Sequence, residues 1–311
     1  EWIALGNPDP GNLYPFRFGI ENFTKVIDYG QFWQCMKNTV LLCVLTVPIS
    51  TFLALLIAVC LNSIKWFSRP LQTIFFLPYV TNSIAIGMVF AAMFNMIIGG
   101  GSKPDSVGII NNVIEFFGGH YINWTNAGSS YWANIVVMVV YIVWNALPFK
   151  ILILLGGLQS VNKQYYDAAK IDGTPKTRVF TRITVPLLSP MLAYVIITGF
   201  IGGFKEYTSI VGIFGENMGP PNDAGRLNTM VGFIYDALKT NSQGRASAAA
   251  LILFGASYGL QGIAEKNARE EHMWLMQTLL PGSESFVVVP YDGEDANIQS
   301  VHKADNGFVI E

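Results

Sequence analysis

Long apolar runs separated by short polar stretches dominate this chain. Five runs are long enough to consider as membrane spans: Asn38–Leu61, Leu71–Ile98, Tyr131–Leu155, Leu187–Val211 and, more weakly, Arg245–Ile263. A spanning helix needs about 20 largely apolar residues. These runs are apolar on nearly every face, whereas a helix on the surface of a soluble protein carries one apolar stripe. We therefore predict an all-α, polytopic membrane helix bundle with five spans; buried helices of a large soluble core are the alternative.

Three of the runs contain an internal proline, at Pro48, Pro78 and Pro148. Membrane helices tolerate proline where neighbouring helices satisfy the freed carbonyl groups. We therefore expect kinks at these positions within continuous spans.

Basic residues are distributed unevenly between the loops. The loop 158–186 carries five of them and the first loop is also basic, whereas the loop 99–130 carries only Lys103. Cytoplasmic loops are enriched in Lys and Arg, so the first and third loops are predicted to face the cytoplasm. This orientation puts residues 1–37 outside, and we expect one further span before Glu1, making six in the intact protein.

Composition agrees with a membrane protein that has a polar tail. Charged residues make up only 13% of the chain, compared with about 25% in soluble domains. Residues 264–311 hold nine acidic and three basic residues, which leaves the rest mildly basic. We predict an extracytoplasmic segment (1–37), a transmembrane domain (38–263) and a soluble tail (264–311) of unknown role, either natural or foreign, with a strand at Phe286–Val289. Nothing in this charge distribution indicates a nucleic-acid partner.

The loop 158–186 contains the most informative motif. Residues 163–172 favour a short helix because Ala168 and Ala169 are good helix formers. Gly173 suits a left-handed helix end, and a proline follows two residues later. A basic loop with such a helix is either a docking element for a partner outside the membrane or a surface turn between two spans.

The same loop resembles that of the membrane subunits of bacterial binding-protein-dependent ABC importers. Their signature reads Glu-Ala-Ala, three residues, Gly, nine residues, Ile, one residue and Leu-Pro. The matching residues here are Asp167, Ala168, Ala169, Gly173, Ile183, Val185 and Pro186. Asp replaces Glu and Val replaces Leu, while Asp172, Phe180 and Pro190 resemble the carbohydrate-uptake branch, the maltose, glycerol-phosphate and multiple-sugar type.

This resemblance covers roughly residues 13 to 255 and implies a mechanism. The loop helix, with Asp172 at its end, is expected to dock onto a separate ATPase subunit. The chain itself is expected to lie in the bacterial cytoplasmic membrane. The implied partners are a second permease subunit, two ATPase subunits, an extracytoplasmic solute-binding protein, the sugar substrate and membrane lipid. Two ATPases that close on ATP would then switch the spans between inward-open and outward-open states.

Enzyme chemistry has no support in the sequence. A phosphate-binding loop needs Gly, four residues, Gly, Lys and Ser or Thr, and Gly99–Lys103 has the wrong spacing. The three histidines are scattered and form no zinc pattern. We expect no cofactor bound by this chain, with ATP used by the partner ATPase.

Polar residues inside spans tend to face a cavity or a neighbouring helix. The candidates for a translocation pathway are Asn82, Ser83, Asn95, Trp144, Asn145, Lys205, Glu206 and Tyr207. Aromatic rings here would stack on a sugar and amides would bond its hydroxyl groups. The competing interpretation is that the amides bond neighbouring helices and that Lys205 pairs with Glu206.

Three rival functions stay open at this point. A polyamine, phosphate or amino-acid importer would share the loop motif. An ion-coupled secondary transporter would favour carboxylates inside broken spans, and Glu206 is the best such candidate. A membrane-anchored assembly protein would use the loop only as a partner site.

Overall fold

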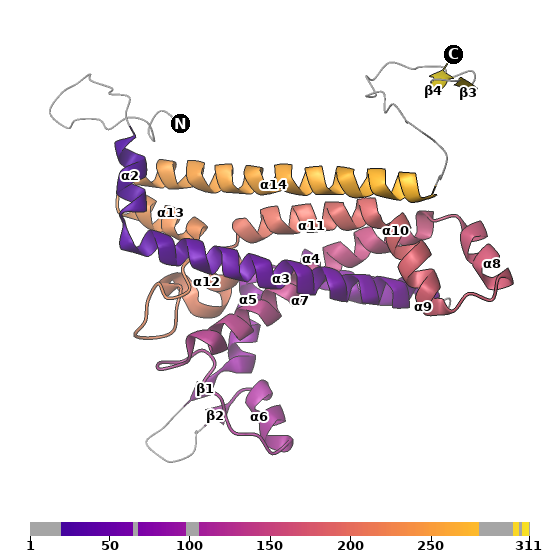
Figure 1. Cartoon of the computed structure of the whole chain (residues 1–311). Coiled ribbons are helices and arrows are strands. Elements are labelled where there is room, and N and C mark those ends of the chain that lie inside the picture. Colours follow the sequence, from indigo (N-terminus) through magenta and orange to yellow (C-terminus); the bar gives the residue numbers. More distant parts are fainter. Residues whose placement is uncertain (1–19, 65–67, 98–105, 280–300, 305–306, 311) are drawn as a thin grey trace. The chain divides into compact units, whose positions relative to one another are not determined.

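The computed structural model describes residues 20–64, 68–97, 106–279, 301–304 and 307–310. The chain divides into two compact units, residues 1–265 and 266–311. The first unit is built from helices, which confirms the predicted all-α bundle (Figure 1). Much of the predicted extracytoplasmic segment, residues 1–19, lies outside the described part of the chain.

Two long helices form the centre of the first unit. They are α3 (Gly30–Ser63) and α7 (Tyr131–Ser160), and α3 packs along α7. At about 1.5 Å per residue, each is long enough to cross a bilayer. Both continue through their internal prolines, Pro48 and Pro148.

The described residues contain two such unbroken spans, or up to four if two bent helix pairs each count as one span. The fifth predicted run, Arg245–Ile263, lies within the 37-residue helix α14 (Gln243–Leu279). The number of spans therefore stays a prediction.

The second predicted span, Leu71–Ile98, is not one continuous helix, although its two helices together still count as one candidate span. The chain forms α4 (Ser68–Val80) and α5 (Ser83–Phe94), whose axes differ by 105°. The break falls at Asn82, which has an extended backbone and whose side chain accepts hydrogen bonds from the amides of Ile84 and Ala85. A capped helix start two residues after α4 ends replaces the expected proline kink.

The fourth predicted span, Leu187–Val211, also has different bounds. It begins within a segment made of α9 (Lys176–Val179), a π-helical turn (Phe180–Thr184) and α10 (Val185–Leu187), and continues as α11 (Ser189–Phe204) after a bend of 66°. Pro190 follows the bend and has no N–H to donate to the preceding turn. After three non-helical residues, the chain forms the separate helix α12 (Thr208–Phe214).

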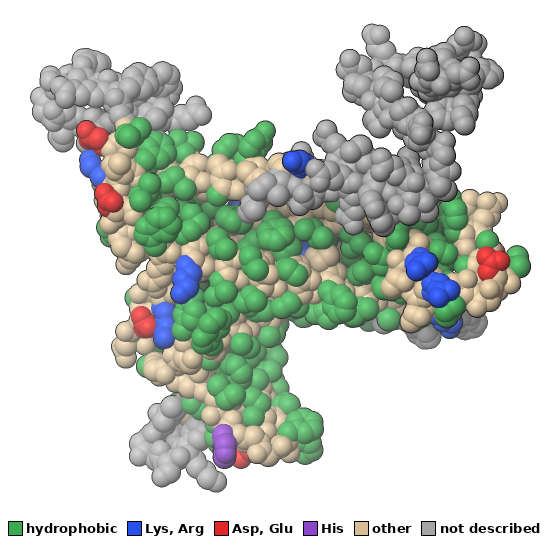
Figure 2. Space-filling view, in the orientation of Figure 1, with side chains coloured by type: hydrophobic (Ala, Val, Ile, Leu, Met, Phe, Trp, Pro, Cys, Tyr) green, Lys and Arg blue, Asp and Glu red, His purple; other side chains and the backbone are tan. Residues whose placement is uncertain are grey.

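Apolar side chains face outward along the two central helices. Val44 and Phe52 on α3 are 52% and 62% exposed, and Val136 on α7 is 44% exposed. Figure 2 shows hydrophobic side chains over most of the drawn face of this unit, and Lys and Arg side chains near the end that carries α9 and α8 (Lys163–Ile171). An apolar surface of this kind is compatible with contact to lipid, which the membrane-bundle prediction requires.

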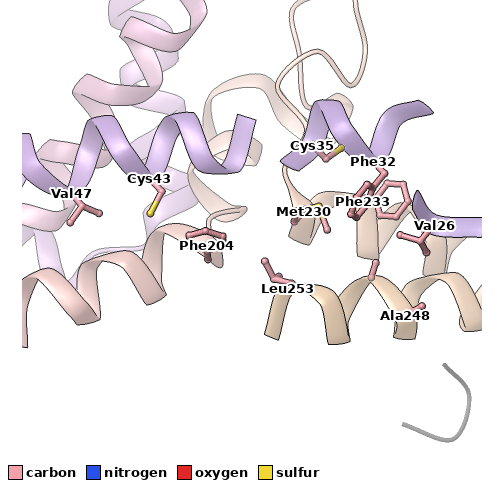
Figure 3. Close-up of a cluster of buried hydrophobic side chains, with 11 residues drawn as sticks. Val26, Phe32, Cys35, Cys43, Val47, Phe204, Met230, Phe233, Ala248 and Leu253 are labelled. Atoms are coloured by element: carbon pink, nitrogen blue, oxygen red, sulfur yellow. The ribbon is translucent and has the colours of Figure 1, made fainter. Parts of the chain in front are cut away.

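The interior of the unit is packed as several apolar clusters, one of which joins five helices. In Figure 3, side chains from α2 (Glu21–Ile27), α3, α11, α13 (Met230–Lys239) and α14 converge. Their members include Val26, Phe32, Cys43, Phe204, Phe233 and Leu253. This cluster holds the first part of α14 against α3 and α13. The two cysteines of the cluster, Cys35 and Cys43, are free thiols.

A closer backbone contact joins α12 to α5. A Cβ atom added to Gly87 would lie 2.6 Å from the Cα atom of Gly212. Glycine at this position therefore allows the two short helices to touch through their backbones.

Polar side chains also fix the first part of α3 to the loop before α13. The side-chain amide of Asn38 donates to the carbonyl groups of Arg226 at 3.0 Å and Asn228 at 2.9 Å, and its oxygen accepts from the Tyr131 hydroxyl at 2.7 Å. These bonds satisfy a buried amide without any ligand.

Small elements complete the two units. In the first, β1 (Met96–Ile97) pairs antiparallel with β2 (Ser106–Val107), and α6 (Ile109–Phe116) follows. In the second, β3 (Val301–Ala304) pairs antiparallel with β4 (Gly307–Ile310). The predicted strand Phe286–Val289 lies outside the described residues.

Candidate functional site

The helix α8 is the short loop helix that the sequence predicts. The side chain of Asn162 caps its start by accepting a hydrogen bond from the Gln164 amide at 3.0 Å. Its end turns through Gly173, which has a φ of +63°, and the Thr174 amide bonds to the Ala169 carbonyl at 3.0 Å. Glycine adopts this left-handed conformation without the steric cost that a Cβ atom brings.

One side of α8 is open to contact. Asp167, Ala168, Asp172 and Gly173 are exposed, whereas Ala169 is buried against the rest of the chain. Asp167 lies 3.1 Å from Lys170, but their side chains remain 65% and 78% exposed, respectively. An exposed pair of this kind contributes little to stability, so these charges are available to a partner.

The remaining motif residues lie in the segment that packs beside α8 and supports it. The Tyr166 hydroxyl lies 3.3 Å from the Thr184 hydroxyl, and Thr184 is buried within the π-helical turn. Ile183 lies in that turn and Pro186 in the helix that follows, and both are half-buried. The Val185 amide bonds to the Phe180 carbonyl, five residues earlier. Turns of this type recur at functional sites, and this one connects α8 to the membrane helix α11.

A partly open cavity of about 310 Å³ lies among α3, α4, α7 and α11. Two of the predicted pathway residues, Asn145 and Glu206, line it. Tyr79 and Phe149 also line it, with ring centroids 6.0 Å apart and an interplanar angle of 18°. Stacked aromatic rings beside a few polar groups are typical of small-molecule sites.

The cavity contains one charged residue that our sequence interpretation missed. Lys150 on α7 is only 4% exposed and lines the cavity. Its Nζ donates to Ser50 Oγ at 2.7 Å, Thr51 Oγ1 at 2.9 Å and the Val47 carbonyl at 3.3 Å. The signal was present in the sequence, since a lysine inside an apolar run is a functional candidate by itself.

Several of the predicted pathway residues have structural partners instead. Asn82 caps α5, the Ser83 carbonyl accepts a hydrogen bond from Tyr141, and the Asn95 side chain accepts from the Met96 amide at 2.8 Å. None of these three is among the described residues that line the cavity.

The aromatic candidates pack on other aromatic rings. The ring centroid of Trp144 lies 5.2 Å from that of Phe90, and the centroid of Tyr207 lies 4.6 Å from that of Tyr235. The structure therefore brings neither ring into the described lining of the cavity.

Glu206 has a structural contact as well as its place in the cavity. Its carboxylate accepts a hydrogen bond from the Ser209 amide at 3.1 Å, and its carbonyl accepts from the Thr229 hydroxyl at 2.8 Å. The described residues show no ion pair between Glu206 and Lys205, which is exposed. Glu206 thus holds the start of α12 while it borders the cavity.

Comparison with known proteins agrees with this arrangement. The family described as "Binding-protein-dependent transport system inner membrane component" matches residues 48–264. The lactose transport system permease protein LacF of Rhizobium radiobacter is 29% identical over 216 residues, covering 68% of each chain. The arabinooligosaccharides transport system permease protein AraP of Halalkalibacterium halodurans is 32% identical over 238 residues, covering 76% of this chain and 70% of that protein.

The fold also has a counterpart among solved structures. A chain of the bacterial alginate ABC transporter, solved in complex with an alginate pentasaccharide-bound periplasmic protein, superimposes with a TM-score of 0.69. The alignment covers 82% of this chain and 84% of that chain at 19% identity. At this level of sequence identity, the structural similarity shows the fold of the chain alone.

Proposed function

Because the chain belongs to the family of binding-protein-dependent transport system inner membrane components, we propose that it is the permease subunit of an ATP-driven importer for a sugar or oligosaccharide. Relatives named for lactose and for arabinooligosaccharides support this substrate class. A permease for trehalose and maltose from Thermococcus litoralis, 28% identical over 236 residues, adds to the same group. Our proposal places the chain in a bacterial cytoplasmic membrane.

The observation that carries the coupling part of the proposal is the construction of α8. Its charged and small residues are exposed on one side. Tyr166 contacts the buried Thr184, which lies in the π-helical turn that precedes α10 and α11. A partner that binds the exposed side can therefore transmit displacement to a membrane helix. We assign that partner as a separate ATPase subunit, which binds the ATP that this chain does not.

The proposed transport cycle needs four further components: a second permease subunit, two ATPase subunits and an extracytoplasmic solute-binding protein. Closure of the ATPases on ATP moves α8 and the helices attached to it as a rigid body. The permease pair then opens outward and receives the solute from the binding protein. The ligand can affect this switch only through a difference in its affinity for the two states.

The test is reconstitution of the complete complex in liposomes together with its binding protein. Lactose, maltose, trehalose and arabinooligosaccharides are the saccharide probes; spermidine, phosphate and an amino-acid mixture are the matched non-sugar probes. We expect at least one saccharide to stimulate ATP hydrolysis and to enter the liposomes only with ATP. Stimulation by a non-sugar probe alone, or ATP-independent uptake driven by an ion gradient, would contradict the proposal.

A further inference from the structure

The three acceptors around Lys150 suit a positively charged amine. Ser50 Oγ donates its own hydrogen to the Thr46 carbonyl at 2.6 Å, and Thr51 Oγ1 donates to the Val47 carbonyl at 2.7 Å. Both hydroxyl oxygens therefore present lone pairs to Lys150. An ammonium group has three donors and no acceptor, so its hydrogen-bonding capacity matches these two oxygens and the Val47 carbonyl.

The described residues provide no carboxylate partner for this amine. Their ion pairs do not include Lys150. Glu206 borders the same cavity, but its carboxylate accepts a hydrogen bond from the Ser209 amide at 3.1 Å and forms no ion pair with Lys150 in the described part of the chain. A buried charge is costly unless it is paired, and Lys150 is solvated here by neutral oxygens alone.

The space beside Lys150 is shaped to admit a ligand. A Cβ atom on Gly199 would lie 3.1 Å from both Lys150 Nζ and Val47 Cγ1, so glycine lets α11 pack closely beside the amine at this wall of the cavity. A Cβ atom on Gly202, one turn further along α11, would meet no atom within 4 Å. The parallel rings of Tyr79 and Phe149 border the same space.

We propose that this cavity binds an acidic saccharide whose anionic group contacts Lys150. The sugar ring packs against Tyr79 and Phe149, and its hydroxyl groups bond to Asn145 and to Glu206 at the far end. The anion replaces the longest of the three Lys150 bonds, the one to the Val47 carbonyl at 3.3 Å. This assignment rests on the proposed function and narrows its substrate class to saccharides that carry a carboxylate or phosphate group.

The test measures ligand binding to the purified permease–ATPase complex. The solute-binding protein is left out so that its own selectivity does not affect the measured affinity. The probes are trigalacturonate, maltotriose phosphate and neutral maltotriose, and the readout is the ligand-dependent shift in melting temperature, titrated to a dissociation constant. We expect an acidic probe to bind at least about tenfold more tightly than maltotriose, since hydrogen bonds to charged groups are stronger than those between neutral groups. Comparison of the two acidic probes distinguishes a carboxylate from a phosphate ligand.

Three variants connect that selectivity to the residue. Lys150→Met should weaken the acidic probe about tenfold or more and leave maltotriose unchanged, while Lys150→Arg should keep the preference for the acidic probe. Gly202→Leu fills the cavity without touching the lysine and should weaken both kinds of probe. If Lys150→Met does not fold, the selectivity of the native complex and the Gly202→Leu result still decide the question.

Equal binding of neutral and acidic probes by the native complex would overturn the inference, as would unchanged acidic binding in Lys150→Met or no binding by any probe. These results leave the proposed function standing if a neutral saccharide is still taken up in liposomes. The proposed function fails separately, when no saccharide of either kind stimulates ATP hydrolysis or uptake in the complete system.

Discussion

The helix α8 and the cavity beside α7 use polar residues in opposite ways. On α8, Asp167 and its neighbours are exposed, and the ion pair between Asp167 and Lys170 is exposed to solvent. In the cavity, Lys150 is buried and each of its hydrogens meets an oxygen of α3. The first arrangement leaves charge available to a protein partner, whereas the second holds an amine among neutral oxygens at the wall of a cavity.

This difference explains how a permease can separate its two tasks. A contact with an ATPase needs an exposed surface on a firm support, and the bond between Tyr166 and Thr184 supplies that support. A solute site needs a concave space with few polar groups in fixed positions.

The largest effect is expected at α8. Gly173→Trp forces a bulky side chain into a left-handed conformation, which costs about 1–2 kcal/mol, and also blocks the exposed side; Asp167→Lys reverses the charge of that side. We expect both variants to insert into the membrane normally and to lose uptake by about a hundredfold or more. Membrane fractionation and solute uptake measure the two properties.

Asp28→Lys is the matched control for the charge reversal. Asp28 is exposed and ends α2, away from the loop that carries α8. Its uptake should equal that of the native protein. Normal uptake by both α8 variants would count against a docking role for this helix.

The next largest effect tests the close backbone contact between α5 and α12. Gly87→Leu forces α5 away from α12, because even a Cβ atom would lie 2.6 Å from Gly212. Overpacking of this kind typically costs about 1–3 kcal/mol. Thermal unfolding in detergent should show the loss. Gly255→Leu is the control, since a Cβ atom there meets nothing within 4 Å; equal stability of the two variants would contradict the close contact.

The smallest effect separates a capping residue from a solute ligand. Asn82→Ala removes the cap of α5 and should cost about 1 kcal/mol, whereas Asn82→Ser keeps a capping oxygen and should retain most of the stability. We expect both variants to transport with unchanged solute selectivity. A change of selectivity in Asn82→Ser, measured by competition between saccharides, would restore the pathway role that the sequence suggests.

The sequence predicts α8 better than it predicts the pathway, and the reason is physical. Alanines, a helix-ending glycine and a following proline act locally, so residues 163–175 determine their own structure. Polar residues in spans carry no such local information, because an amide bonds equally well to a backbone or to a solute. Asn82 and Asn95 accept hydrogen bonds from neighbouring backbone amides, which their positions in the sequence do not reveal, while Lys150 was overlooked among the apolar residues of α7.

The bends escaped prediction for a related reason. Proline patterns identify where a helix is weakened but not whether it breaks, since Pro48 and Pro148 lie inside continuous helices. The 105° turn after Pro78 depends on the capping side chain of Asn82 and on the contact of α5 with α12. The cap is local, whereas the contact of α5 with α12 joins distant parts of the chain and could not be predicted from the residues around Pro78.

The most direct test of the central claim is crosslinking from α8. The exposed Cys60 is first replaced by Ser, which leaves the buried Cys35 and Cys43 as the native thiols. Ala168→Cys then carries the crosslinker on α8, and Phe116→Cys, which replaces an 84% exposed side chain on α6, is the matched control. The account predicts that Ala168→Cys captures an ATPase subunit with a yield that changes when ATP is added, and that Phe116→Cys does not. Failure to capture any ATPase from Ala168→Cys, in membranes that still take up the solute, would contradict it.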